Sequence, residues 1–188
     1  EVEGRMTTFV AKVTGLPTDQ AYALQKRYLE EHGLTLRGLM LDHGVDPADF
    51  HALFHDLSLQ VLAHDADLLA ALERLPGRRL IFTNADAFHA ERVLSHLGLH
   101  HLFDDVFHID SFGFRPKPDP AAFTAMLDAH GMAPDATAFF EDSERNLAPA
   151  AALGMTTVLV GAHAAASPAP FVHHRTEKLA PFLATARL

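Results

Sequence analysis

The chain of 188 residues is 48% hydrophobic and 21% charged, as in ordinary globular proteins, and no apolar run reaches the roughly 20 residues that span a bilayer, so we expect no membrane partner. Its formal net charge of -9 argues against a nucleic-acid partner, because surfaces that neutralise phosphate backbones are basic. The chain has no cysteine, which excludes disulfides and thiolate metal sites and agrees with a cytoplasmic location.

Residues 1–62 carry only helical patterns and predict a small all-helical domain. Apolar residues recur three and four positions apart, and glycines stand where the first three of the four runs stop. We expect four helices in this order: Met6 to Gly15, Thr18 as N-cap to Gly33, Leu36 to Gly44, and a helix opened by Asp46-Pro47 that carries Phe50 to Leu57. Proline at the first helical position supports the start of the last helix.

Residues 63–188 alternate between helical and strand patterns, which predicts an α/β fold with a parallel sheet and helices on both faces. The expected helices are 69–75, 90–97, 119–130, 147–153 with Pro149 in its first turn, and 179–186; the expected strands are 79–82, 106–109, 138–140 and 156–160. In open α/β sheets ligands bind at the carboxyl ends of the strands. Polar residues at those ends are therefore the candidate site.

Thr83 and Asn84 directly follow the first of these strands and precede a helix. The Thr83 hydroxyl and the next backbone N–H groups are placed to meet an anion at a helix N-terminus. The alternative is that Thr83 or Asn84 is only the N-cap of that helix, since threonine and asparagine are common N-caps.

Lys117 lies between Pro116 and Pro118 in a loop after a strand. The two prolines restrict the backbone, so the side chain starts from a fixed point and suits delivery of one positive charge to a phosphoryl group. The alternative is a solvated loop lysine.

Glu141 and Asp142 follow the strand at 138–140 as an adjacent acid pair. Neighbouring carboxylates repel one another unless a cation is shared, and oxygen ligands of this kind suit Mg²⁺. The alternative is that both acids only cap the next helix.

Taken together, Thr83, Lys117 and the acid pair resemble the haloacid dehalogenase superfamily of phosphotransferases, whose fold is a Rossmann-like parallel sheet with a helical cap. The resemblance implies that Thr83 binds phosphoryl oxygens, that Lys117 balances charge, and that Asp142, assisted by Glu141, holds Mg²⁺. Asn84 is expected to line the same pocket. The catalytic residues in this interpretation are Thr83, Lys117 and Asp142.

A narrower resemblance is to pyrimidine 5′-nucleotidases. It rests on four segments: Tyr28 to Leu39, Arg115 to Pro120, Glu141 to Asn146, and Leu179 to Leu183. It implies a pyrimidine nucleoside 5′-monophosphate as the small-molecule substrate, with Arg37 of the cap reaching the phosphate or the base. Arg37 is equally interpretable as a surface arginine.

The family nucleophile belongs to an Asp-x-Asp motif on a first, central strand, which precedes the helical cap. This chain begins directly with the helical pattern of residues 1–62 and contains no such motif at the end of a strand. Asp65-Ala66-Asp67 opens a helix instead. We therefore expect the nucleophile upstream of Glu1, hydrolysis through an aspartyl-phosphate in the full-length protein, and no activity from this chain alone. Two alternatives remain: a non-catalytic phosphate- or nucleotide-binding protein, and a metal-independent haloacid dehalogenase. We expect a monomer or homodimer.

Overall fold

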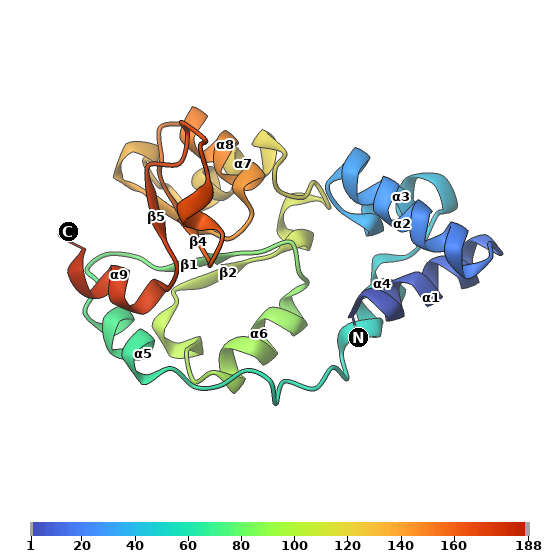
Figure 1. The fold of residues 1–188 in the computed structure, drawn as a ribbon, viewed down its shortest axis with the longest axis horizontal. Coiled ribbons are helices and arrows are strands. Elements are labelled where there is room, and N and C mark those ends of the chain that lie inside the picture. The colour runs from blue at the N-terminus through green and yellow to red at the C-terminus, as the bar shows by residue number, and fades with distance from the viewer. Residues whose placement is uncertain (1, 187–188) are drawn as a thin grey trace.

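The structure is a computed structural model that describes residues 2–186; Glu1 and residues 187–188, the outermost residues of the two predicted domains, lie outside the described residues. Figure 1 shows two parts connected by an extended linker. We call residues 2–54 the helical unit and residues 66–185 the sheet unit. No helix in the described part of the chain is long and apolar enough to cross a membrane.

The helical unit contains four α-helices and one 3-10 turn: α1 (Val2–Thr14), α2 (Thr18–His32), α3 (Thr35–His43), α4 (Pro47–His51) and the 3-10 turn Ala52–Phe54. These elements pack around a shared apolar cluster that includes Val10, Leu39 and Phe50. Gly33 and Gly44 end α2 and α3 in left-handed conformations, as the sequence predicts. Burial of one stripe of each helix in the cluster stabilises helices that are individually short.

Two details of the predicted helices are wrong. Thr18 is the first residue of α2 rather than its N-cap, which is Pro17 and makes no side-chain hydrogen bond. The fourth helix stops well before Leu57, since the α-helix ends at His51 and the chain continues as the 3-10 turn Ala52–Phe54. Beyond this turn the Arg92 guanidinium donates to the carbonyl oxygens of Phe54 and Leu57 at 3.2 and 2.7 Å. A distant side chain thus binds backbone groups of the segment that we predicted to be helical.

The sheet unit alternates between helices and strands. Its helices are α5 (Ala66–Glu73), α6 (Ala87–His96), α7 (Pro120–His130), α8 (Glu144–Ala152) and α9 (Leu179–Thr185). Its strands are β1 (Leu80–Phe82), β2 (Asp105–Phe107), β3 (Ala138–Glu141), β4 (Thr156–Val160) and β5 (His174–Thr176). Every strand pair is parallel, so the predicted α/β class is confirmed.

Three predictions in this unit need correction. The strand at 105–107 ends before Ile109, which begins a 3-10 turn. Pro149 lies in the interior of α8, because that helix begins at Glu144 and not at Leu147. The strand β5, for which we predicted no element, pairs with β4 through His174, Arg175 and Thr176.

The strands form two separate sheets, β1 with β2, and β3 with β4 and β5. Within residues 2–186 no backbone ladder connects β1 to β3, so each of these strands has one edge without a neighbouring strand. Unpaired backbone groups at sheet edges are normally covered or paired. The edges of β1 and β3 are therefore the unusual feature of this fold.

The two sheets nevertheless share the same hydrophobic layers. On one face, α7 and α8 pack with Phe82 of β1 and Phe139 of β3; on the other face, α5, α6 and α9 pack with Ile81 and Phe140. The rings of Phe82 and Phe139 have centroids 6.0 Å apart. The faces of both sheets are thus aligned, as in one sheet covered by helices on both sides.

Candidate functional site

Thr83 lies at the carboxyl end of β1, and its backbone is fixed by the neighbouring strand. Its N–H donates to the Phe107 carbonyl at 3.0 Å, and its Oγ1 accepts from the Ala85 N–H at 3.0 Å. The N-cap of α6 is Asp86, whose carboxylate accepts from the His89 N–H. The alternative of Thr83 or Asn84 as the helix cap is therefore wrong.

Asn84 holds the loop that carries Lys117. Its Oδ1 accepts from the Lys117 N–H at 2.9 Å, and its Nδ2 donates to the Lys117 carbonyl at 3.2 Å. Both ends of one amide thus bind the backbone of a single residue. In this structure Asn84 positions the lysine, whereas we expected it to line the pocket directly.

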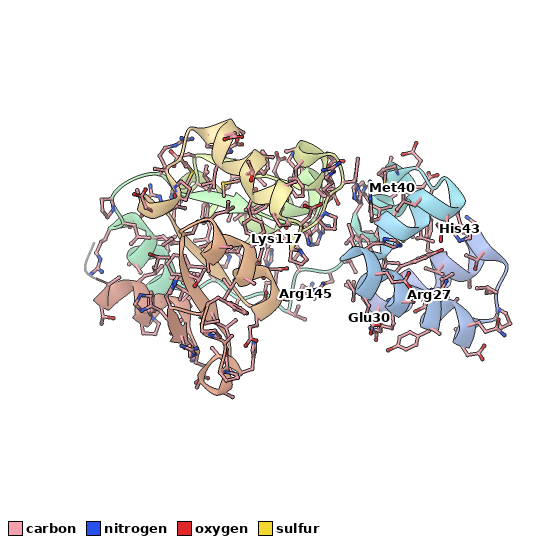
Figure 2. The ribbon with its side chains drawn as sticks, turned by 90° about the horizontal axis from the view of Figure 1, so that it is seen from above. Arg27, Glu30, Met40, His43, Lys117 and Arg145 are labelled. Atoms are coloured by element: carbon pink, nitrogen blue, oxygen red, sulfur yellow. The ribbon has the colours of Figure 1, made fainter. Side chains whose placement is uncertain are left out.

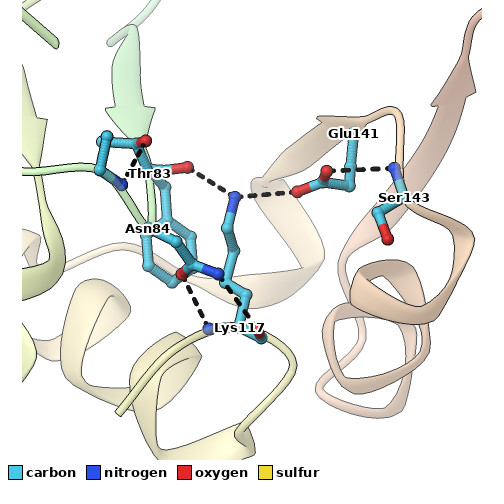
Figure 3. A network of polar contacts seen from close by, with 7 residues as sticks. Thr83, Asn84, Lys117, Glu141 and Ser143 are labelled. Atoms are coloured by element: carbon cyan, nitrogen blue, oxygen red, sulfur yellow. Dashed lines mark hydrogen bonds and ion pairs between the residues drawn. The ribbon is translucent and has the colours of Figure 1, made fainter. Parts of the chain in front are cut away.

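The Lys117 ammonium is buried between the two sheets, with only 7% of the residue exposed. Its Nζ donates to the Phe82 carbonyl oxygen at 2.7 Å and to Glu141 Oε2 at 2.8 Å. Figure 3 shows the contact between Lys117 and Glu141. It also lies over the rings of Phe82 and Phe139, 4.9 and 5.2 Å from their centroids. The alternative of a solvated loop lysine is wrong, because this cation connects the ends of β1 and β3.

Glu141 and Asp142 differ in environment although they are adjacent. Burial is the largest influence on the Glu141 carboxyl and raises its pKa, but the Lys117 ammonium and hydrogen bonds, including one from the Ser143 N–H, outweigh it and leave the pKa below its usual value. The hydrogen bond with Glu141, followed by partial burial, raises the pKa of Asp142. Neither acid is the N-cap of α8, which is Ser143.

One further residue at this edge was missed from the sequence. His163 follows β4, and its Nε2 lies 2.8 Å from the Asp142 carbonyl oxygen, to which it donates. A side chain on Gly161 would come within 2.9 Å of the His163 ring. The strand-end rule that singled out Thr83 and Glu141 also applies to the residues after β4, so this signal was present in the sequence.

The acid pair fits Mg²⁺ only as part of a ligand set. Among residues 2–186 no three His, Asp or Glu side chains are arranged to hold a metal ion. Mg²⁺ often takes one or two carboxylates and completes its shell with water and phosphate oxygens. Asp142 is exposed and its pKa is raised by Glu141 beside it, and a cation would relieve this unfavourable proximity.

Arg37 does not join the cluster around Lys117. It lies on α3 and lines a cleft between the helical unit and the sheet unit, together with Arg115 and Arg145. Within the described residues its guanidinium has no hydrogen bond or ion pair. The structure therefore brings together Thr83, Asn84, Lys117, Glu141 and Asp142, and leaves Arg37 in a neighbouring cleft.

Comparison with known proteins gives one family. A family model for haloacid dehalogenase-like hydrolases matches residues 8–154. Phosphate metabolism protein 8 of Saccharomyces cerevisiae is 31% identical over 170 residues, which cover 82% of this chain and 53% of that protein. A fructose-1-phosphate phosphatase of Escherichia coli is 34% identical over 102 residues, 48% of this chain and 54% of that protein. The chain thus spans about half the length of these curated relatives.

Solved structures share the fold at lower identity. A HAD phosphatase from Thermococcus onnurineus superposes with a TM-score of 0.62 at 17% identity, over 94% of this chain and 84% of that one. An L-2-haloacid dehalogenase from Xanthobacter autotrophicus with covalently bound chloropropionic acid gives 0.58 at 18% identity, over 98% and 92%. Phosphatases and dehalogenases therefore share this architecture, and the fold alone does not choose between their reactions.

Proposed function

The chain belongs to the haloacid dehalogenase-like hydrolase family, and we propose that the whole protein hydrolyses a small phosphomonoester, with a pyrimidine nucleoside 5′-monophosphate as the first candidate. The observation that carries this proposal is the buried Lys117 ammonium at the carboxyl ends of β1 and β3. A cation in this position suits the charge of a phosphoryl group. We further propose a cytoplasmic monomer or homodimer.

Lys117 and Thr83 each keep a donor for the substrate. An ammonium has three N–H donors, and the Phe82 carbonyl and Glu141 take two of those of Lys117; the third is available to a phosphoryl oxygen. The Thr83 Oγ1 accepts a hydrogen bond from the Ala85 N–H, so its own O–H can donate to a second oxygen. Asn84 keeps the origin of the lysine side chain fixed.

Asp142, assisted by Glu141, is our proposed ligand pair for Mg²⁺. When bound, the ion would neutralise negative charge on the phosphoryl oxygens. Glu141 has a second task in this proposal, because it holds the Lys117 ammonium in place. Asp142 is the more exposed of the two acids and offers the freer carboxylate.

The nucleophile is proposed to lie on a strand outside these 188 residues. No described strand ends in an Asp-x-Asp motif, while β1 and β3 each keep an unpaired edge and Lys117 connects their ends. A strand carrying the nucleophilic aspartate at its carboxyl end would meet the Lys117 ammonium there. Attack of that carboxylate on phosphorus would break the ester P–O bond and form an aspartyl-phosphate. A second upstream aspartate would protonate the leaving alcohol, and its carboxylate would then take a proton from the water that hydrolyses the aspartyl-phosphate to phosphate. The predicted domain of residues 1–62, which contains the helical unit, would act as the cap that excludes bulk water.

The test uses the full-length protein, with phosphate release measured for uridine, cytidine and adenosine 5′-monophosphates and for sugar phosphates, with and without Mg²⁺. We expect Lys117→Ala to lower turnover by about a hundredfold or more. Arg74→Gln is the control, since Arg74 is the C-cap residue of α5 and binds the Ala184 carbonyl far from the site. An undiminished rate for Lys117→Ala would remove the proposed role.

The same assay decides between the alternatives. Halide release from a 2-haloacid that persists without Mg²⁺ would favour a dehalogenase. Phosphate or nucleotide binding without turnover would favour a non-catalytic protein. Hydrolysis of sugar phosphates in preference to nucleotides would support the proposed phosphatase activity but contradict the proposed nucleotide substrate.

A further inference from the structure

The cleft that contains Arg37 lies between the helical unit and the loop that carries Lys117. Its volume is about 560 Å³. Figure 2 shows Arg145 at the edge of the sheet unit that faces the helical unit, with Glu30 on the opposite side. The floor is closely packed, since a side chain on Gly33 would come within 3.3 Å of Pro116 and 3.4 Å of the Lys117 carbonyl.

Three guanidinium groups reach this cleft from three different elements. Arg37 comes from α3, Arg115 from the loop before Lys117, and Arg145 from the first turn of α8. Within residues 2–186 the side chains of Arg37 and Arg115 make no hydrogen bond or ion pair, and Arg145 makes only a long one to the Gly33 carbonyl at 3.5 Å. Because guanidinium groups stay charged at any physiological pH, their donors remain available to an anion.

Three acidic residues also line the cleft, and two of them have contacts with groups other than its arginines. Glu31 lies 4.0 Å from Arg27 and 3.9 Å from His32. Asp119 uses Oδ1 to accept from the Ala121 N–H at the start of α7. Glu30 is the remaining carboxylate on the wall. The cleft therefore has three guanidinium groups and three carboxylates on its walls. Within the described residues none of the arginines pairs with these acids, so the guanidinium donors face the cleft without a protein anion bound to them.

We propose that this cleft binds a second anionic group of the substrate, a carboxylate or a second phosphate, while the first phosphate lies at Lys117. This inference rests on the proposed function. Arg115 precedes Lys117 by two positions and Arg145 follows Asp142 by three, so the cleft and the phosphate site share a loop and a helix start. Guanidinium groups bind planar carboxylates and phosphates through paired hydrogen bonds, which suits them to this selection.

The experiment compares three nucleotides that share one 5′-phosphoryl ribose: uridine 5′-monophosphate, orotidine 5′-monophosphate with a carboxylate on the base, and uridine 3′,5′-bisphosphate. With full-length protein we expect kcat/KM for one doubly anionic nucleotide to exceed that for uridine 5′-monophosphate by about tenfold or more, and which one does so identifies the second anion. Equal or lower values for both would overturn the proposal.

Variants locate the preference in the cleft. Arg115→Gln and Arg145→Gln should each reduce the ratio of doubly to singly anionic kcat/KM by about tenfold. Glu30→Gln should raise that ratio, because it removes the opposing carboxylate. Arg74→Gln, at the C-cap of α5 and outside the cleft, is the matched control and should leave the ratio unchanged. A ratio that neither arginine variant lowers would contradict the assignment.

A binding measurement separates this inference from the proposed function. Calorimetric titration of the same three nucleotides needs no turnover, so it reports on the cleft even if the protein hydrolyses none of them. Absence of hydrolysis would then contradict the proposed phosphatase activity but not the proposed anion binding in the cleft. Tighter binding of a doubly anionic nucleotide, weakened in Arg115→Gln, supports the cleft, and equal affinities for all three nucleotides overturn it.

Discussion

Lys117 and Glu141 form a buried ion pair in which each side chain compensates the charge of the other. Their side chains are only 9% and 8% exposed, so removing one partner leaves an uncompensated charge in the interior. We expect Lys117→Met to lower the free energy of unfolding by about 3 to 5 kcal/mol at neutral pH. Lys12→Met, which replaces an exposed lysine of α1, is the control and should change it by less than about 0.5 kcal/mol.

The ion pair is tested more specifically by the pH dependence of the stability difference between the unchanged protein and Lys117→Met. The pKa of Glu141 is below its usual value of 4.5 in the folded protein, so the stabilisation by its ionised form is present above pH 4.5 and is lost as the pH falls through the lower folded value. In Lys117→Met burial, the largest influence on Glu141, is no longer opposed by the ammonium. The pKa of Glu141 should therefore be higher than in the unchanged protein, and protonation relieves the penalty of the unpaired charge. Urea denaturation across this pH range should show that the free energies of unfolding of the unchanged protein and of Lys117→Met converge as the pH falls. A difference that stays constant with pH would contradict the electrostatic coupling between Lys117 and Glu141.

The positions of Thr83, Lys117 and Glu141 at one sheet edge were predictable, because Thr83 follows β1, Glu141 ends β3 and Lys117 lies in the loop after β2, all in a parallel arrangement. The task of Asn84 was not predictable, since its partner is the backbone of a residue 33 positions away. The same holds for the arginine cleft. Its three guanidinium groups come from separate elements, and only the packing of the helical unit against the loop at 115–118 brings them together.

At the scale of elements, the contact between α2 and α3 depends on Gly38. A side chain there would lie 2.3 Å from Cγ of Tyr28, a ring that is itself only 2% exposed. We expect Gly38→Ala to lower the free energy of unfolding by about 1 to 3 kcal/mol through overpacking. Gly4→Ala in α1, where nothing lies within 4 Å, should be neutral or stabilising by up to about 1 kcal/mol. Thermal unfolding of both variants checks this, and equal effects would contradict it.

The elements predicted correctly are those whose ends are marked locally. Gly33, Gly44 and Gly131 adopt the left-handed conformation that favours glycine and end their helices where predicted. The strand β5 has no such mark. His174 and Arg175 are exposed and do not alternate with apolar residues, so only the pairing with β4 makes this segment a strand. Local sequence patterns contain no information about that pairing.

At the scale of the whole molecule, the two sheets behave as the halves of one sheet. Phe82 and Phe139 contact each other in one layer, Ile81 and Phe140 share the other layer, and Lys117 joins the strand ends. Side chains alone thus hold β1 beside β3. A strand supplied by a longer protein would need to separate Phe82 from Phe139 and replace their contact with two backbone ladders.

Hydrogen exchange can test whether a longer protein supplies that strand. In the chain of 188 residues, we expect amides on the unpaired edges of β1 and β3 to exchange much faster than those facing β2 and β4, because an unpaired N–H lacks a ladder hydrogen bond. In the full-length protein both edges should become protected, by about a hundredfold or more. The strand β4 is the internal control, since it pairs on both sides, with β3 and β5, and its amides should be protected in both proteins. If the edge amides of β1 and β3 exchange equally fast in the full-length protein while β4 stays protected, no strand enters between the sheets, and the proposed nucleophile must lie elsewhere.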